Sequence, residues 1–286
     1  MSAPEPRGIV HCADGVEVAR GLADEAVDLV YLDPPFNTGK RQELNQIRTR
    51  RVAEGGGDRT GFGGRRYETV RLGSRSFDDV FDDYLGFLEP FLVESRRLLK
   101  PSGSLYLHLD YREAHYAKVL LDQVFGRECF VNEIIWAYDY GGRTKKRWPP
   151  KHDTILFYAK DAARYLFNTD EVERIPYMAP ELAGAEKAAR GKLPTDTWWH
   201  TIVSPTGREK TGYPTQKPLG VLKRIVSASS PPGGLVVDLV AGSGTAGAAA
   251  LELGRRFVLA DCSEEAVGVM RERFAGEAGV EFHKNA

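Results

Sequence analysis

An acid, two prolines and an aromatic residue follow one another in Asp33-Pro34-Pro35-Phe36, here called the DPPF turn. The prolines fix φ at their positions and remove two amide donors, so the turn keeps unpaired carbonyl acceptors. A carboxylate, free carbonyl oxygens and a ring face suit a planar group with an amino substituent, because the acceptors bind its N–H groups while the ring stacks on it. The apolar run at residues 27–32 predicts a buried strand that ends at this turn.

A second candidate site is the segment Gly242-Ser243-Gly244-Thr245, here called the glycine loop. It lies between an apolar run at 235–240 and an alanine-rich helix expected from Ala248 to Leu253. Glycines allow a ligand to approach the backbone closely, and a helix N-terminus offers N–H groups to an anionic group. Asp261 ends a further expected strand, 19 residues after Gly242, where nucleotide-binding folds place an acid on ribose hydroxyls.

Gly242, Gly244 and Gly247 also satisfy the dinucleotide fingerprint, so a nicotinamide-dependent dehydrogenase is an alternative. Two features argue against it. The dinucleotide unit usually opens its domain, whereas here it closes the chain, and a dehydrogenase has no use for the DPPF turn.

A third segment, Tyr213-Pro214-Thr215-Gln216-Lys217-Pro218, completes a set that resembles a known family. The DPPF turn resembles the Asp/Asn/Ser-Pro-Pro-Tyr/Phe motif of S-adenosylmethionine-dependent methyltransferases that act on exocyclic amino groups of DNA bases. The glycine loop is similar to that family's Asp-Pro-Phe-x-Gly-Ser-Gly-Thr, with Leu239 and Val240 replacing Pro-Phe, which puts an aromatic contact at Val240 in doubt. The segment at 213–218 is similar to the family's Thr-Gln-Lys-Pro, which lies beside the methionine end of the cofactor. The catalytic motif precedes the cofactor loop, as in the permuted β group of the family.

The resemblance implies a fold, a set of site residues and partners. The fold is a Rossmann-like, doubly wound α/β methyltransferase sheet with circularly permuted motif order. Catalysis is assigned to Asp33, Pro34, Pro35 and Phe36. S-adenosyl-L-methionine is assigned to Asp14, Leu32, Thr215, Lys217, Asp238, Gly242, Ser243, Gly244, Thr245, Asp261 and Cys262. The partners are double-stranded DNA, a second copy in a homodimer, and a restriction endonuclease that acts on the same site.

Composition is consistent with a cytoplasmic enzyme. The 286 residues are 42% apolar and 28% charged, enough for one large or two small domains with a substantial core. No apolar run reaches membrane-spanning length, and the N-terminus lacks a signal-peptide pattern. The three widely spaced cysteines predict reduced thiols, and the sequence shows no cluster of metal ligands.

Positive charge concentrates in two places, although the net charge of the chain is −1. Residues 40–75 hold ten basic and four acidic residues, a net charge of +6, and are rich in glycine. This composition predicts a mobile basic loop that binds phosphates, with a solvated insertion as the alternative. The residues expected to contact DNA are Arg41, Arg48, Arg50 and Arg51 here, and Lys145, Lys146 and Arg147 in a second cluster beside Trp148.

Alternating strand and helix patterns predict that residues 1–160 and 213–286 form one catalytic and cofactor-binding domain with a largely parallel sheet. Asp110 lies near the end of an expected strand, where it either lines a base pocket or serves as a helix cap or ion-pair partner. Residues 161–212 break the alternation and correspond to the family's target-recognition region. Trp198 and Trp199 within it are expected to stack on bases or to pack in the core.

These residue types suggest a mechanism. The amino nitrogen of adenine or cytosine is a poor nucleophile, since its lone pair is delocalised into the ring. Asp33 and a carbonyl of the turn, such as that of Pro34, would accept its two N–H groups and direct the lone pair at the sulfonium methyl. Phe36 would stack on the base, which must leave the duplex. In the family, an acid at the first motif position favours adenine N6, with cytosine N4 as the alternative.

Other reaction classes fit less well. Carbon-5 methylation of cytosine requires a cysteine after a proline, whereas the three cysteines follow His11, Glu128 and Asp261. An RNA or protein amide methyltransferase is an alternative, because a similar turn holds an amide, but the +6 segment favours a polyanion. A non-catalytic DNA-binding module explains neither the DPPF turn nor the glycine loop.

Overall fold

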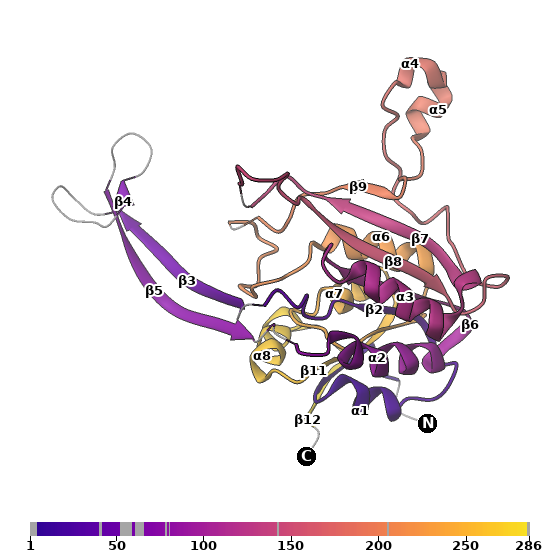
Figure 1. Cartoon of the computed structure of the whole chain (residues 1–286), viewed down its shortest axis with the longest axis horizontal. Helices are drawn as coiled ribbons and strands as arrows, with labels where there is room; N and C mark the ends of the chain where they lie inside the picture. The colour runs from indigo at the N-terminus through magenta and orange to yellow at the C-terminus, as the bar shows by residue number, and fades with distance from the viewer. Residues whose placement is uncertain are drawn as a thin grey trace.

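A nine-stranded mixed sheet forms the body of the molecule, and a three-stranded sheet extends from it (Figure 1). The computed structural model describes residues 5–39, 42–51, 59–60, 66–77, 79, 81–141, 143–204 and 206–284, with backbone only for 42–51, 59–60 and 66–77. The large sheet contains, in spatial order, β12 (Val280–Lys284), β1 (Gly8–Cys12), β11 (Arg256–Asp261), β10 (Leu235–Asp238), β2 (Val27–Leu32), β6 (Leu99–Leu109), β8 (His152–Ala159), β7 (Phe130–Ala137) and β9 (Thr197–Trp199).

The strands from β12 to β6 all run parallel, which confirms the expected α/β fold. β8 is antiparallel to both of its neighbours, β6 and β7. Thr154, near the start of β8, therefore pairs with Leu109 at the end of β6. As a result, the carboxyl ends of the parallel strands and the beginning of β8 share one edge of the sheet, where ligands bind in folds of this class.

Helices cover both faces of the large sheet. One face packs against α1 (Gly15–Arg20), α2 (Tyr84–Leu98) and α3 (Ala114–Phe125). The 3-10 turn η2 (Arg127–Cys129) follows α3. The other face packs against α6 (Leu219–Ser229), α7 (Thr245–Glu252) and α8 (Glu264–Arg273). Along β2, Val30 and Leu32 belong to the first core cluster and Leu29 and Tyr31 to the second. A strand buried on both faces needs a continuous apolar run, as the sequence has there. No helix in the described part of the chain has the length and apolar character to cross a bilayer.

The segment expected as a loop at 40–75 has strands where the structure describes it. Strands β3 (Gln42–Arg51), β5 (Arg66–Phe77) and β4 (Arg59–Thr60) form an antiparallel sheet, here called the arm. Its root is fixed beside the DPPF turn by hydrogen bonds. The amide of Gly39 donates to the carbonyl of Asp79 at 3.0 Å, and the amide of Phe81 donates to Asn37 Oδ1 at 3.0 Å. The expectation of a loop was wrong for these residues, because strand pairing satisfies their backbone; its mobility stays a prediction.

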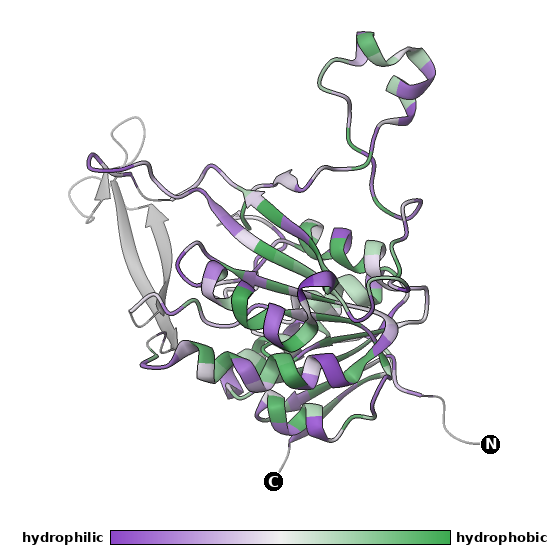
Figure 2. Ribbon diagram, turned by 45° about the vertical axis from the view of Figure 1, so that its right-hand side comes forward, coloured by the Kyte–Doolittle hydropathy of each residue, from purple (hydrophilic) through white to green (hydrophobic). Residues whose placement is uncertain are grey.

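The region at 161–212 divides into two parts. Beyond the bridge between Ile175 and Lys192, α4 (Pro180–Ala183) and α5 (Ala185–Arg190) stand away from the sheet in both views (Figures 1 and 2). Strand β9, in contrast, joins the large sheet, with Trp198 opposite Trp136. Trp198 is 7% exposed and Trp199 is 78% exposed, so the first packs in the core and only the second is free for stacking.

Candidate active site

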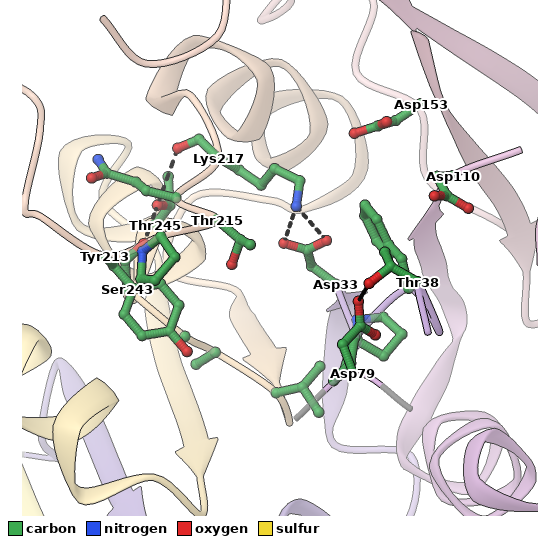
Figure 3. A pocket seen from close by; sticks show the side chains of 18 of the residues that line it. Asp33, Thr38, Asp79, Asp110, Asp153, Tyr213, Thr215, Lys217, Ser243 and Thr245 are labelled. Atoms are coloured by element: carbon green, nitrogen blue, oxygen red, sulfur yellow. Dashed lines mark hydrogen bonds and ion pairs between the residues drawn. The ribbon is translucent and has the colours of Figure 1, made fainter. Parts of the chain in front are cut away.

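A cavity of about 980 Å³ opens at the edge where the carboxyl ends of the parallel strands meet. Figure 3 shows that it has two sides with the DPPF turn between them. The glycine-loop side includes Asp14, Tyr213, Thr215, Asp238, Gly242, Ser243, Thr245, Asp261 and Cys262. The β8 side includes Asp110, Tyr111, Trp136, Tyr138, His152 and Asp153. The three motifs identified in the sequence, which come from opposite ends of the chain, therefore line one cavity.

Asp33 of the DPPF turn lies at the centre of this cavity and is paired with Lys217. Both of its carboxylate oxygens accept hydrogen bonds from Lys217 Nζ, at 2.6 and 2.5 Å. The two side chains are 17% and 9% exposed. The same ammonium lies 4.8 Å from the centre of the Phe36 ring. Each carboxylate oxygen has a second lone pair, so Asp33 still has acceptor capacity for an N–H group in the cavity.

The segment at 213–218 is positioned by its own hydrogen bonds. Gln216 accepts from the Thr211 amide at 2.8 Å and donates to the carbonyl of Glu209 at 2.8 Å, which fixes the shape of the segment. Thr215 lines the cavity, as expected. Lys217, which the resemblance assigns to the cofactor, bonds to Asp33 instead and so joins this segment to the DPPF turn.

Only glycine fits the backbone conformation at positions 242 and 244 of the glycine loop. Gly242 and Gly244 have φ values of +51° and +71°, in the left-handed region that L side chains avoid. A Cβ on Gly244 would also lie 2.8 Å from Met270 Cγ. Gly244 thus packs against α8 instead of lining the cavity, while the neighbouring Ser243 and Thr245 line it.

Three carboxylates make the glycine-loop side acidic. Each accepts a hydrogen bond from a backbone amide two residues further on: Asp14 from Val16 at 2.9 Å, Asp238 from Val240 at 3.1 Å and Asp261 from Ser263 at 2.8 Å. Asp261 also accepts from the amide of Gly242 at 2.8 Å, which closes the glycine loop onto β11. Burial raises the pKa of Asp238 well above its usual value and raises that of Asp261 as well. Such a wall suits hydroxyl donors and cationic groups.

The β8 side contains a buried polar network that the sequence motifs did not reveal. Tyr31 Oη and His108 Nδ1 are 2.8 Å apart, and His108 Nε2 is 3.1 Å from Asp153 Oδ2. Tyr138 donates to Asp153 Oδ1 at 2.9 Å. A neutral imidazole satisfies every member, because Nε2–H donates to Asp153 while Nδ1 accepts from Tyr31. Burial alone would raise the pKa of Asp153, but the hydrogen bond from His108 and the charge of Lys217 lower it below its usual value.

Asp110 and Arg147 both line the cavity. Asp110 lines the cavity, accepts from the Arg112 amide at 2.9 Å and pairs with the Arg112 guanidinium. Arg147 also lines the cavity and lies 3.4 Å from the hydroxyl of Tyr111. The basic cluster therefore meets the β8 side at Arg147.

Several predicted site residues lie elsewhere. Leu32 is 1% exposed and packs in the core behind the cavity. Lys145 and Lys146 are exposed and do not line the cavity. Arg41 lies outside the described residues, and Arg48, Arg50 and Arg51 lie on β3, of which the structure describes the backbone. Their contacts with DNA stay predictions.

Comparison with known proteins identifies the family. The profile of the N6/N4 methylases, described as DNA methylase, matches residues 27–272. The chain belongs to this family. Membership confirms the resemblance drawn from the three motifs: the protein is a DNA amino-methyltransferase, and S-adenosylmethionine is its methyl donor.

Curated relatives of this methyltransferase are similar over most of the chain. The Type II methyltransferase M.HpaI of Haemophilus parainfluenzae is 27% identical over 266 residues, which cover 93% of this chain and 74% of the relative. The DNA adenine methyltransferase YhdJ of Escherichia coli (strain K12) is 29% identical over 274 residues, which cover 91% of this chain and 80% of the relative.

Solved structures share the fold of this methyltransferase. TTHA0409 from Thermus thermophilus, complexed with S-adenosyl-L-methionine, has a TM-score of 0.61 and 20% identity, covering 98% of this chain and 99% of that one. The cytosine-N4-specific PvuII DNA methyltransferase has a TM-score of 0.62 and 14% identity, covering 98% of both chains. At these identities, the comparison supports the Rossmann-like architecture.

Proposed function

We propose that this enzyme methylates adenine N6 at specific sites in double-stranded DNA. The observation that carries the proposal is the position of Asp33, which faces the cavity between the glycine-loop side and the β8 side. A base amine on the β8 side would donate one N–H to Asp33 and the other to a carbonyl of the DPPF turn. Both bonds strengthen as positive charge develops on the nitrogen, so they stabilise the transition state more than the bound base.

The glycine-loop side fits S-adenosylmethionine, which supplies a methyl group on a sulfonium. Asp261 is placed to accept from ribose hydroxyls through lone pairs that its backbone hydrogen bonds leave free. The hydroxyls of Ser243 and Thr245 are placed to bind the polar methionine end. The cavity of about 980 Å³ is at the upper end of the range for ligand pockets, roughly 300–1,000 Å³, as expected for a site that holds a nucleoside and a base.

Lys217 gives the DPPF turn a fixed orientation. Its two short hydrogen bonds hold the Asp33 carboxylate in one orientation at the cavity, and each oxygen keeps a lone pair for a further donor. Orientation matters here because much of the rate of a direct displacement comes from aligning the nucleophile with the methyl group. We therefore assign Lys217 to positioning Asp33.

The β8 side supplies the walls of the base pocket. The base must leave the duplex, because its amine is otherwise out of reach. Phe36 and Tyr138 line the cavity and offer ring faces for stacking on the extruded base, and the buried Trp136 packs against Tyr138. Trp136 is held by a hydrogen bond from its indole N–H to the carbonyl of His200 at 2.7 Å, so this wall is rigid.

Adenine is favoured over cytosine by the acid at the first position of the DPPF turn. The relative from Escherichia coli is named as an adenine methyltransferase, which agrees with this choice. Cytosine N4 is the second candidate, since a structure with the same fold is named as cytosine-N4-specific.

The proposed DNA contacts involve the arm, the basic cluster and the region at 161–212. Arg41, Arg48, Arg50 and Arg51 would bind phosphates beside the DPPF turn, because the root of the arm follows that turn directly. Arg147 would do so where it lines the cavity, and the exposed Lys145 and Lys146 would do so outside it. Residues 161–212 would read the target sequence. A homodimer and a companion restriction endonuclease complete the proposal.

Product analysis tests the reaction. Unmethylated plasmid DNA would be incubated with the enzyme and S-adenosylmethionine, digested to nucleosides and analysed by mass spectrometry. We expect N6-methyladenine. Detection of N4-methylcytosine would change only the proposed target base, whereas detection of 5-methylcytosine would overturn the proposed mechanism. A variant with Cys12, Cys129 and Cys262 all changed to serine should keep most of its activity, since no covalent intermediate forms.

Salt dependence tests the arm. Each phosphate contact that a basic residue makes contributes about −0.9 to the slope of log affinity against log salt concentration. A variant with Arg48, Arg50 and Arg51 changed to glutamine should show a shallower slope. An unchanged slope would leave the arm as a solvated insertion.

A further inference from the structure

Arg273, on α8, lies directly behind the glycine loop and holds two of its residues. Its Nη1 donates to the carbonyl oxygen of Ser243 at 2.7 Å, to Thr245 Oγ1 at 2.9 Å and more weakly to Ser243 Oγ at 3.4 Å. These contacts join α8 to the loop at the start of α7, the helix that begins at Thr245. No element of the three sequence motifs contains this arginine.

Arg273 is a partly buried cation without an acidic partner. Among the residues that the structure describes, no carboxylate lies within ion-pair distance of its guanidinium. Burial lowers its pKa, and the distant charges of Glu209 and Glu252 oppose this shift only in part. A partly buried guanidinium without a counterion gives the glycine loop a positive potential, which favours an anionic group of a ligand there. Arg271 on the same helix shows the ordinary alternative, because it is exposed and lies over the Phe282 ring.

The donors of Arg273 determine which way the loop hydroxyls point. A guanidinium only donates, so Thr245 Oγ1 accepts from it and must send its own hydrogen elsewhere. The carbonyl of Lys217, at 3.3 Å, receives that hydrogen. Ser243 Oγ is 3.1 Å from Thr245 Oγ1, which keeps one acceptor lone pair after the bond from Arg273, so the Ser243 hydrogen has a neutral partner there. A charged acceptor in the cavity would form a stronger bond with the same hydrogen.

The two walls of the glycine-loop side consequently have opposite character. Asp14, Asp238 and Asp261 present acceptors, whereas Ser243 and the amides at the start of α7, backed by the guanidinium, present donors and positive potential. A zwitterionic amino acid needs this pairing, because its ammonium requires acceptors and its carboxylate requires donors. The methionine end of S-adenosylmethionine is such a group.

We propose that Arg273 is a positioning residue for the cofactor: it fixes Ser243 and the amides at the start of α7 as the donor wall for the methionine carboxylate and supplies the charge that balances it. The proposal rests on the assignment of the glycine loop to S-adenosylmethionine. It predicts selectivity for the carboxylate that a purely structural role would not produce.

Calorimetric binding of two ligands tests this selectivity, with S-adenosylmethionine and its decarboxylated form as probes. Arg273→Met should weaken binding of S-adenosylmethionine by about 10- to 100-fold, the scale for a lost hydrogen bond to a charged group. Binding of the decarboxylated form should change by less than roughly threefold. Arg271→Met is the matched control on the same helix and should change neither affinity.

The outcomes separate this proposal from the assignment on which it rests. If the unaltered enzyme binds neither probe, the assignment of the glycine loop fails. If it binds S-adenosylmethionine, two results for Arg273→Met would overturn the carboxylate role: an equal loss of affinity for both probes, or no loss for either. Should Arg273→Met fail to fold in a melting experiment, Ser243→Ala provides the same comparison and should show the same loss of selectivity. Arg273→Lys keeps the charge but not the three contacts, so its affinity for S-adenosylmethionine should lie between that of the unaltered enzyme and that of Arg273→Met.

Discussion

The two sides of the cavity are built by different kinds of contact. On the glycine-loop side, the acids bond to amides two residues away in the chain, as in the pairs Asp14–Val16, Asp238–Val240 and Asp261–Ser263. On the β8 side, the buried network joins distant partners, since Tyr31 and His108 are 77 residues apart and His108 and Asp153 are 45 apart. Asp110 on that side is the exception, because it accepts from the Arg112 amide two residues away.

This difference predicts which substitutions affect ligand binding and which affect the stability of the fold. Asp14 and Asp238 are each held by their own turn, so removing either one alters the ligand contacts and leaves its neighbours in place, whereas Asp261 also holds the Gly242 amide. The β8 network connects β2, β6 and β8, so removing one member leaves buried partners unsatisfied. We therefore expect substitutions on the glycine-loop side to affect mainly ligand affinity, and those on the β8 side to affect mainly stability.

The largest effect is expected at Asp33, where the two sides meet. Asp33→Ala removes the acceptor that stabilises the developing charge on the amine, so turnover should fall by about 100- to 1,000-fold. S-adenosylmethionine affinity should change little, because Asp33 lies outside the glycine-loop side. Methyl transfer from radiolabelled S-adenosylmethionine to DNA measures the first quantity, and calorimetry measures the second.

Two further variants define the role of Asp33. Asp33→Asn retains one oxygen acceptor and avoids leaving the Lys217 ammonium beside a methyl group, so it separates lost catalysis from lost packing. Asp82→Ala, which removes an exposed acid elsewhere in the chain, is the control and should be fully active. Turnover that survives in both Asp33 variants would contradict the mechanism.

The next effect is on stability and compares the two sides directly. Asp153→Ala leaves His108 Nε2–H and the Tyr138 hydroxyl without acceptors in the interior, which should lower the free energy of unfolding by about 2–4 kcal/mol. Asp14→Ala removes the N-cap of α1 and should cost only about 1 kcal/mol. Urea unfolding of both variants measures the difference. Equal losses would mean that the β8 network is no more cooperative than a local turn.

The same distinction explains what the sequence could predict. The DPPF turn, the glycine loop and Asp261 are local patterns, and the structure places all three at one cavity. His108 and Asp153 gave no signal as partners, because a histidine and an acid 45 residues apart meet only when β6 and β8 pair.

Residues 40–75 show a further limit of sequence analysis. Their charge and glycine content indicated a loop, because such a composition packs poorly into a core. Composition carries no information on the pairing of β3 with β5. The family resemblance assigns Leu32 to the cofactor, yet the alternation of side chains along β2 directs it into the core.

A smaller effect is expected at Asp261. Asp261→Ala should weaken binding of S-adenosylmethionine by about 1–3 kcal/mol, since ribose hydroxyls lose an acceptor and the Gly242 amide loses its own partner. Stability should change less than in Asp153→Ala. Calorimetry with S-adenosylmethionine and with a nicotinamide dinucleotide measures the effect. Preference of the unaltered enzyme for the dinucleotide would reverse the cofactor assignment.

The smallest effect is a pH dependence that originates at Asp238. Burial raises the pKa of this carboxyl in the folded protein, above about 3.9 for an unfolded aspartate. The stability that its protonated form contributes is therefore complete below about pH 3.9 and is lost as the pH rises through the raised pKa. A cationic ligand favours the ionised carboxylate, so binding of S-adenosylmethionine should release a proton, and its affinity should rise over the same pH window.

One proton limits this gain to about tenfold in affinity per pH unit. Calorimetry in two buffers with different ionisation enthalpies would count the protons released. Asp238→Asn, which keeps an oxygen for the Val240 amide but cannot titrate, should abolish the release and flatten the profile. Affinity that falls as the pH rises, or proton release that persists in Asp238→Asn, would place the titrating group elsewhere, first at Asp261, whose pKa is also raised by burial.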